Sequence, residues 1–202
     1  MVEQLFCNID DKSVVYRSVS DLFGVCTYFL VDDKKILIID PGKLSDEVYN
    51  WLLPFTNHQK YIYLTHEHFD HHFDVNKLME FKNTYLYLYS DEFKNALCNS
   101  RTNLSYYYNT PIETSTKNTI DLLFLNLLKT PGHGKFSVCF LNKNLLFGGD
   151  TVIEKQYLVL KLPGSNKNFF KESMEKLKKI IPKDTIVLPG HGSLFCFDSW
   201  KI

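Results

Sequence analysis

The chain has 202 residues, of which 45% are apolar and 23% charged, a composition typical of a globular protein with a single domain over residues 1–202. Lys and Arg total 23 and Asp and Glu total 23, so no net charge attracts a polyanion, which argues against nucleic acid as the main partner. No stretch approaches the roughly 18 consecutive apolar residues of a membrane-spanning helix, so we expect no membrane partner.

The first half of the sequence predicts strands that alternate with helices. Residues 25–40 have the pattern of two strands joined by a polar turn at Asp32–Lys35. The next elements are predicted, in chain order, as a helix over 44–53, a strand over 61–65, a helix over 74–81, a strand over 84–89 and a helix over 91–99. Residues 101–118 show no period and predict a loop. Its three tyrosines, Tyr106–Tyr108, either line a pocket or pack as a solvated loop.

The second half predicts more strands and one long helix. The elements are a strand over 124–129, a hairpin of strands 136–141 and 144–147, a helix over 166–180 and a strand over 185–188. Many of the predicted strands end in small and ligand-type residues. Loops at strand ends are where rigid scaffolds place chemistry, so we expect the site there.

The start of the chain carries acids and lacks a basic segment followed by an apolar run, so it does not predict a secretory signal. The five cysteines are scattered and form no Cys-x-x-Cys pair. They are predicted to be free thiols of a cytoplasmic protein.

The segment that begins at Thr65 is the densest set of metal ligands in the sequence. If the preceding strand continues, His66 and His68 point to the same side, because strand side chains alternate. Asp70 and His71 fall on the turn that follows, where they face a neighbouring point. This spacing favours two adjacent metal ions, although a solvated loop would also account for a histidine-rich tract taken alone.

Further ligand-type residues follow at later strand ends. His133 and His191 each lie in a Pro-Gly-His-Gly sequence, and Asp150 follows two glycines. Glycines beside a ligand let the backbone approach a metal or a substrate closely. The carboxylate of Asp150 is placed where it could bridge two cations.

Seven residues, in this order, resemble the metal ligands of the metallo-β-lactamase superfamily: His66, His68, Asp70, His71, His133, Asp150 and His191. The resemblance covers nearly the whole chain. It implies an α/β fold, a four-layer αββα sandwich of two mixed β-sheets flanked by helices, with the metals at one edge. It implies that His66, His68 and His133 hold one metal, that Asp70, His71 and His191 hold the second, and that Asp150 bridges them. The implied cofactors are two zinc ions, with iron as the alternative.

Within the superfamily, the sequence is similar to the glyoxalase II-like hydrolases, which cleave thioesters. The similarity rests on Thr130-Pro-Gly-His, on Gly148-Gly-Asp-Thr and on the run from Leu162 through a helix to the last Pro-Gly-His-Gly. Residues 134–137 depart from the family's usual Thr-Pro-Gly-Ser. The chain also ends shortly after His191, without the helical extension that helps hold glutathione in the full-length enzymes, so glutathione specificity is in doubt.

The implied reaction is hydrolysis of a small-molecule thioester by a metal-bridging hydroxide, since metal-bound water has a pKa near ~7. A thiol leaving group, with a pKa near ~8.5, departs without strong acid assistance. Asp70 is the catalytic candidate, predicted to orient the nucleophile or accept its proton. Asp40 resembles the superfamily's carboxylate that supports the metal-binding loop, and Glu67 is predicted to point away from the metals.

The remaining polar candidates have alternative roles. His58 and His72 are predicted to lie at the surface or behind the ligands, and not to bind metal. Lys135, Lys161 and Asn166 are candidate contacts for an anionic part of the substrate, with simple solvent exposure as the alternative.

Several rival functions stay open. An iron-dependent persulfide dioxygenase on the same scaffold would bind iron and consume oxygen. Neutral charge disfavours phosphodiester hydrolysis, and the presence of all seven ligands disfavours a non-catalytic metal-binding module. Lactone and β-lactam hydrolysis remain candidates because the same hydroxide attacks any activated carbonyl. The acyl group, the thiol carrier and the oligomeric state are not determined by the sequence.

Overall fold

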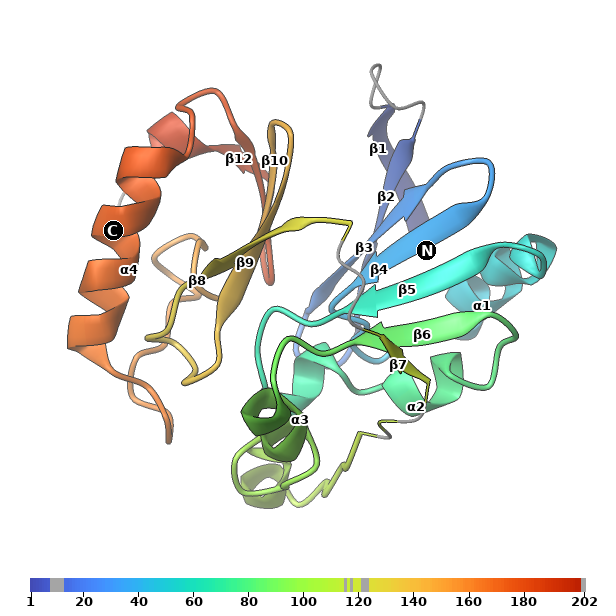
Figure 1. The fold of residues 1–202 in the computed structure, drawn as a ribbon, viewed down its shortest axis with the longest axis horizontal. Coiled ribbons are helices and arrows are strands. Elements are labelled where there is room, and N and C mark those ends of the chain that lie inside the picture. Colours follow the sequence, from blue (N-terminus) through green and yellow to red (C-terminus); the bar gives the residue numbers. More distant parts are fainter. Residues whose placement is uncertain (8–12, 115, 117, 121–123, 201–202) are drawn as a thin grey trace.

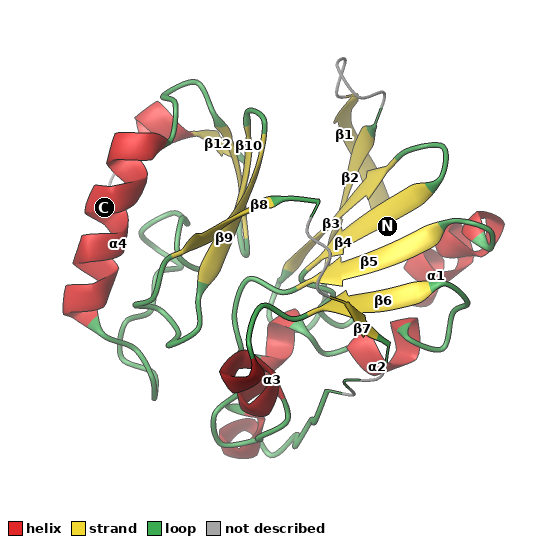
Figure 2. Cartoon of the chain, in the orientation of Figure 1, coloured by secondary structure: helices red, strands yellow, loops and turns green. Residues whose placement is uncertain are grey.

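The computed structural model describes residues 1–7, 13–114, 116, 118–120 and 124–200. Two mixed β-sheets pack face to face, and helices cover both outer faces (Figures 1 and 2). This is the four-layer αββα arrangement that the resemblance implied, so the predicted fold class is confirmed.

The larger sheet has seven strands in chain order, and the first four are antiparallel to their neighbours while the last three run parallel to β4. The strands are β1 (Val2–Cys7), β2 (Val14–Val19), β3 (Cys26–Val31), β4 (Lys35–Ile39), β5 (Gln59–Tyr63), β6 (Thr84–Tyr87) and β7 (Thr119–Ile120). The hairpin of β3 and β4 was predicted, as were β5 and β6. Strands β1, β2 and β7 were not, because they lie at the side of the sheet or are too short for a clear alternation.

Three short helices cover the outer face of this sheet: α1 (Asp46–Leu52), α2 (Val75–Leu78) and α3 (Asp91–Leu97) (Figure 2). Each lies within its predicted range. Helix α2 is the shortest of the three, and the chain continues from it through turns and a bend to residue 83. Helix α3 begins where the Ser90 hydroxyl accepts the Phe93 N–H, a standard N-cap. Between α3 and β7, the segment predicted as a loop contains a 3₁₀ turn, Ser105–Tyr108.

The smaller sheet has the strand order β12-β11-β10-β9-β8, and its only parallel pair among the described strands is β10 with β11. Its strands are β8 (Asn126–Lys129), β9 (Val138–Asn142), β10 (Leu145–Gly149), β11 (Ile186–Pro189) and β12 (Phe195–Cys196). Helix α4 (Lys167–Ile180) covers its outer face. All of these except β12 were predicted. No helix in the described ranges is long and apolar enough to cross a membrane.

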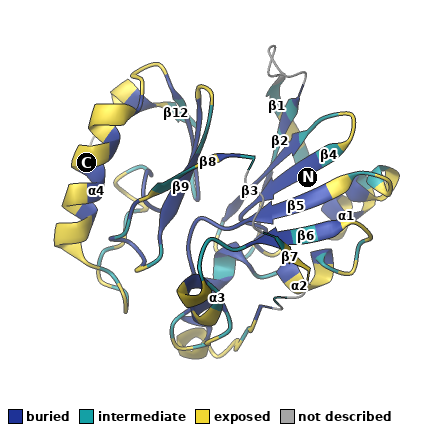
Figure 3. Cartoon of the chain, in the orientation of Figure 1, coloured by how far each residue is buried: buried dark blue, intermediate teal, exposed yellow. Residues whose placement is uncertain are grey.

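Strand alternation divides the apolar residues among three cores. The strands of both sheets are largely buried (Figure 3). On β4, Leu37 and Ile39 face the second sheet, where they meet Phe140 of β9, whereas Ile36 and Ile38 face the helices. A third core packs α4 against the outer face of the smaller sheet. Because both faces of the sheet are buried at β4, this strand is apolar at consecutive positions.

The two sheets are joined at the edge where several strands end. The Val138 N–H donates to the Thr65 carbonyl at 2.7 Å, and the Cys26 N–H donates to the Gly190 carbonyl at 2.7 Å. The first bond holds the loop after β5 against the start of β9, and the second holds the start of β3 against the loop after β11. The predicted ligands all belong to loops at this edge.

Candidate metal centre

The histidine-rich segment follows β5 as a loop. The strand ends at Tyr63, two residues before the predicted end, so it does not continue through His66 and His68. The reason is Asp40, whose Oδ1 accepts the Thr65 N–H at 2.7 Å and so turns the backbone away from the sheet. The chain then enters a 3₁₀ turn at Phe69–His71. His66 and His68 nevertheless contribute to one cluster.

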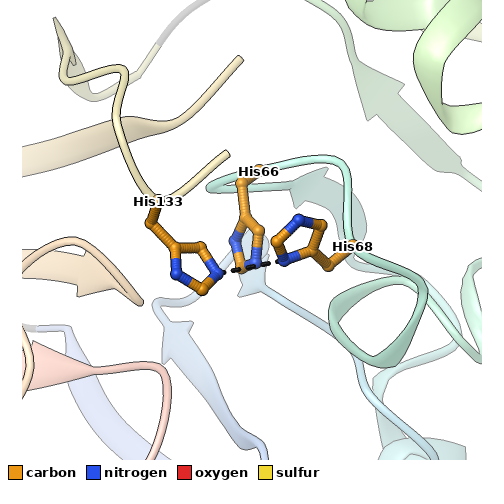
Figure 4. A group of neighbouring side chains, drawn as sticks. All are labelled: His66, His68 and His133. Carbon is orange, nitrogen blue, oxygen red and sulfur yellow. Dashed lines mark hydrogen bonds between the residues drawn. The ribbon is translucent and has the colours of Figure 1, made fainter. Parts of the chain in front are cut away.

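Three imidazoles form the first cluster, with one ring nitrogen from each of His66, His68 and His133 within 4.8 Å of the others (Figure 4). The Nε2 of His133 lies 3.0 Å from Nδ1 of His68. The Nε2 atom of His66 is buried and has no hydrogen-bond partner among the described residues. A buried polar atom without a partner is costly, and three imidazole nitrogens around one point are the donor set of a transition metal.

Asp70, His71 and His191 form the second cluster. The Nε2 atoms of His71 and His191 are 3.4 Å apart, and Asp70 Oδ2 lies 3.7 Å from each of them. Two ligands placed about 2.1 Å from the same tetrahedral ion would be about 3.4 Å apart. The three atoms therefore already have the separation of ligands to a common cation.

Asp150 stands between the two clusters. Its Oδ2 lies 3.5 Å from Nε2 of His133, in the first cluster, and 3.5 Å from Nε2 of His191, in the second. Its Oδ1 lies 3.4 Å from Nε2 of His71. Gly190 leaves the space that this carboxylate occupies, because a Cβ atom at that position would collide with Asp150 Oδ1.

Asp40 lies behind two of the ligand imidazoles, those of His66 and His71, and determines which of their ring nitrogens carries the proton. Its Oδ2 accepts the Thr65 hydroxyl at 2.6 Å and lies 3.0 Å from Nδ1 of His71. The Thr65 hydroxyl is 3.0 Å from Nδ1 of His66, and since it donates to Asp40 it must accept from that ring. Both imidazoles thus carry their proton on Nδ1, which leaves the Nε2 lone pairs directed into the clusters.

The family model of the metallo-beta-lactamase superfamily matches residues 21–191, most of the chain and all seven predicted ligands. The chain belongs to this superfamily. Membership makes it a metal-dependent hydrolase.

Two curated relatives and one solved structure illustrate its place in the superfamily. A probable metallo-hydrolase of Bacillus subtilis, YqgX, is 30% identical over 178 residues, covering 82% of this chain and 83% of the relative. A hydroxyacylglutathione hydrolase of Shewanella halifaxensis is 24% identical over 172 residues, covering 83% of this chain but 58% of the relative. The crystal structure of the BLEG-1 B3 metallo-beta-lactamase superposes with a TM-score of 0.72 at 24% identity, covering 98% of this chain and 95% of that one.

The protonation states of the side chains in the two clusters also favour the binding of cations. Burial lowers the pKa values of His66, His68 and His133, so these rings stay neutral, as metal binding requires. Burial opposes ionisation of Asp150, but the adjacent His71 and His191 hold the pKa of its carboxyl well below the usual range. In the second cluster burial raises the pKa of the Asp70 carboxyl, and the neighbouring carboxylates, against the effect of burial, raise the pKa values of His71 and His191, so a bound cation would displace protons there.

His133 is oriented by contacts to both halves of the molecule. Its Nδ1 donates to the Val159 carbonyl at 2.9 Å, which leaves Nε2 free to face the cluster. The turn that follows it is held by Glu67, which accepts the Lys135 N–H at 2.8 Å and the Phe136 N–H at 3.2 Å. Glu67 therefore points away from the ligands, as predicted, and connects the loop after β5 to the His133 turn. Gly134 leaves room for this carboxylate, since a Cβ there would lie 2.7 Å from Glu67 Oε2 and would displace it.

The structure also places the remaining polar candidates. His72 is buried behind the ligands, one of the two positions predicted for it, and its Nε2 donates to the Glu67 carbonyl while its Nδ1 contacts Thr114. Asn166 does not face a substrate: its side chain accepts the Asn168 and Phe169 N–H groups and caps α4. Lys135 and Lys161 do not line the cavity at the metal centre.

A cavity of about 330 Å³ opens beside the ligands and is lined by Asp70, His133, Asp150 and His191 together with apolar side chains. Tyr108 lines it, so part of the predicted tyrosine loop does form a pocket wall, whereas Tyr106 and Tyr107 do not. Phe23 and Tyr157 also line it and were not predicted. Neither belongs to a ligand motif, and their only signal was an aromatic residue in a turn.

Proposed function

We propose that this protein is a zinc-dependent hydrolase of thioesters, with one metal held by His66, His68 and His133, a second by Asp70, His71 and His191, and both by Asp150. The observation that carries the proposal is the position of Asp150 Oδ2, equally distant from a nitrogen of each cluster. An oxygen in that position suits a bridge between two cations. Imidazole and carboxylate donors with no sulfur suit zinc and also iron.

When bound, the two metal ions would polarise a substrate carbonyl and lower the pKa of a coordinated water towards about 7. The protein's own contribution is orientation. Asp40 and Thr65 fix the tautomers of two ligands, and the Val159 carbonyl fixes that of His133. Asp70 lines the cavity as well as the second cluster, so we assign it the role of orienting the attacking water and accepting its proton.

The cavity supports a thioester over a substrate with a poorer leaving group. Among the described residues that line it, no carboxylate, lysine or histidine stands apart from the proposed ligands. The proton donors that the lining offers to an alkoxide or an amide nitrogen are therefore the phenols of Tyr108 and Tyr157, together with Asp70 once it has accepted a proton. A thiol, with a pKa near ~8.5, can leave as the thiolate without one. The match to a hydroxyacylglutathione hydrolase, an enzyme of thioesters, agrees with this choice.

The first test is metal content by elemental mass spectrometry on protein purified without a metal-affinity tag. About two zinc ions per chain would support the proposal. About one iron per chain, with oxygen consumption on a persulfide, would replace it with sulfur oxidation on the same ligands.

The second test is turnover of the zinc-loaded protein on simple thioesters, with release of the thiol followed by a thiol reagent. Matched oxygen esters of the same acyl groups serve as controls. Thioester turnover well above the ester rate, after correction for the spontaneous rates, is the expected result. Equal enhancement of esters, or hydrolysis of a lactone or β-lactam alone, would contradict the proposal.

A further inference from the structure

We propose that the cavity selects substrates with an uncharged, apolar acyl group, preferably an aromatic one, and that it does not recognise an anionic thiol carrier. This inference rests on the proposed function, because it specifies the thioester. It is carried by three properties of the cavity: an aromatic wall that begins at the ligands, a strained backbone beneath that wall and a lining without cationic side chains.

The aromatic wall consists of Phe23, Phe69 and Tyr108. The Phe69 ring lies 5.5 Å from Phe23 and 5.3 Å from Tyr108, and Phe23 and Tyr108 are 5.4 Å apart between ring centroids. Phe69 stands in the chain between the proposed ligands His68 and Asp70, so the wall begins at the metal centre. A group attached to a carbonyl at this centre would enter the cavity that all three residues line.

The outer rings of this wall are open to solvent. Phe23 is 46% exposed and Tyr108 is 49% exposed, although both line a concave site. Leu104 and Leu162 extend the apolar lining. Exposed aromatic faces around a cavity are a usual feature of a binding site for an apolar group, since the ligand removes them from water.

The backbone is strained at two positions under this lining. Phe23 has a φ of +63° and Leu104 a φ of +70°. Positive φ is uncommon for a bulky residue, whereas Asn and Asp, which account for four of the other five described non-glycine positions with positive φ, tolerate it. Both large apolar residues that adopt this conformation line the same cavity. Such strain persists where surrounding structure enforces it, and it often marks a functional site.

The charge of the lining excludes a carrier that is recognised through its carboxylates. Among the described residues, no Lys or Arg lines the cavity, and its carboxylates are Asp70 and Asp150. The nearby Lys135 directs its ammonium group over the Phe136 ring, 5.3 Å from the centroid. A glutathione thioester has two carboxylates and would find no Lys or Arg partner for them in this lining, where the proposed metal ions would bind the thioester carbonyl.

The test compares thioesters that differ in one part at a time on the zinc-loaded protein. S-acetyl and S-phenylacetyl N-acetylcysteamine differ in the acyl group, and S-phenylacetylglutathione changes the carrier. After division by the spontaneous hydrolysis rates, we expect kcat/KM for phenylacetyl to exceed that for acetyl by about tenfold or more, the usual effect of burying a phenyl ring. We expect no gain from glutathione.

Two tyrosine variants supply the matched comparison. Tyr108→Ala should reduce the phenylacetyl preference to about threefold or less, since the ring loses one of its partners. Tyr107→Ala removes an adjacent tyrosine that is 58% exposed but does not line the cavity, and it should keep the preference. Equal loss in both variants, or a strong preference for glutathione, would overturn the inference while leaving thioester hydrolysis in place.

A binding measurement separates this inference from the proposed function. Isothermal titration calorimetry of the zinc-loaded protein with phenylacetate and with acetate needs no turnover. We expect phenylacetate to bind about tenfold more tightly or better, and Tyr108→Ala to remove the difference. If no thioester is hydrolysed but this preference is found, the proposed reaction fails and the apolar site stands. If the two acids bind equally, the inference is wrong.

Discussion

Replacement of Glu67 by Gln is predicted to weaken metal binding at the three-histidine cluster and to leave the second cluster intact. The Glu67 side chain is buried, and its carboxylate accepts two backbone N–H groups of the turn after His133, at 2.8 and 3.2 Å. It lies between His66 and His68 in the chain. It therefore fixes the third ligand of the cluster relative to the first two, which come from the other sheet.

The size of the effect follows from the hydrogen bonds. A buried N–H left without a partner costs about 1–3 kcal/mol. The Gln amide keeps one acceptor oxygen but turns a donor towards the other N–H, so Glu67→Gln should lose about 1–3 kcal/mol of unfolding free energy. Domains of this kind are stable by about 5–15 kcal/mol, so the variant should fold. Loss of a residue that orients a ligand typically lowers metal affinity by about 10–100-fold.

Competition with a chromophoric chelator measures this affinity in two backgrounds. His191→Ala leaves the three-histidine cluster as the main site, and His133→Ala leaves the second cluster. We expect Glu67→Gln to weaken zinc binding about 10–100-fold in the first background and by less than about threefold in the second.

Asp74→Asn is the matched control. Asp74 is also a partly buried carboxylate that accepts a backbone N–H, from Leu44 at 2.7 Å, but it packs against α1, away from His133. It should lose stability without a change in metal affinity. Equal weakening in both backgrounds, or the same weakening in Asp74→Asn, would refute the positioning role of Glu67.

The remaining predictions concern the metal ligands, the space beside Asp150 and the ionisation of Lys60. Asp150→Ala and His68→Ala should each lower kcat by about a thousandfold or more, because metal-ion catalysis contributes several kcal/mol; circular dichroism should show a folded chain, and near-normal turnover in either variant would contradict the paired site. Gly190→Ala should displace the Asp150 carboxylate and reduce bound zinc measured by elemental mass spectrometry, whereas Gly24→Ala, where a Cβ meets nothing within 4 Å, should retain it despite a φ of +69°. Lys60 is buried, its ammonium donates to the Phe55 carbonyl at 2.8 Å, and burial lowers its pKa. The unfolded chain then binds this proton more readily, so wild-type stability should rise with pH from that lowered pKa up to about 10.4. Urea unfolding should show that Lys60→Met lacks this rise, and identical pH slopes would contradict it.

The sequence alone predicted the set of ligands that we propose and, through its resemblance to a known superfamily, the fold class. Ligand residues adjacent in the chain, such as those after Thr65, are brought together by local geometry, and the apolar runs of β3 and β4 match a sheet buried on both faces. The helical stripe of α4 was equally clear, because fourteen residues span several turns of one period.

Tertiary structure decided how these residues work together. That Asp150 stands equally far from His133 and His191 depends on loops from three strands meeting at one edge, which no local pattern encodes. The short strands β7 and β12 are held by pairing with neighbours, because two residues are too few for an intrinsic preference. The cavity wall joins a turn near the start of the chain to a 3₁₀ turn over eighty residues later, through contacts between Phe23 and Tyr108. A surface assembled from such distant segments is determined by packing, and packing becomes visible only in the folded molecule.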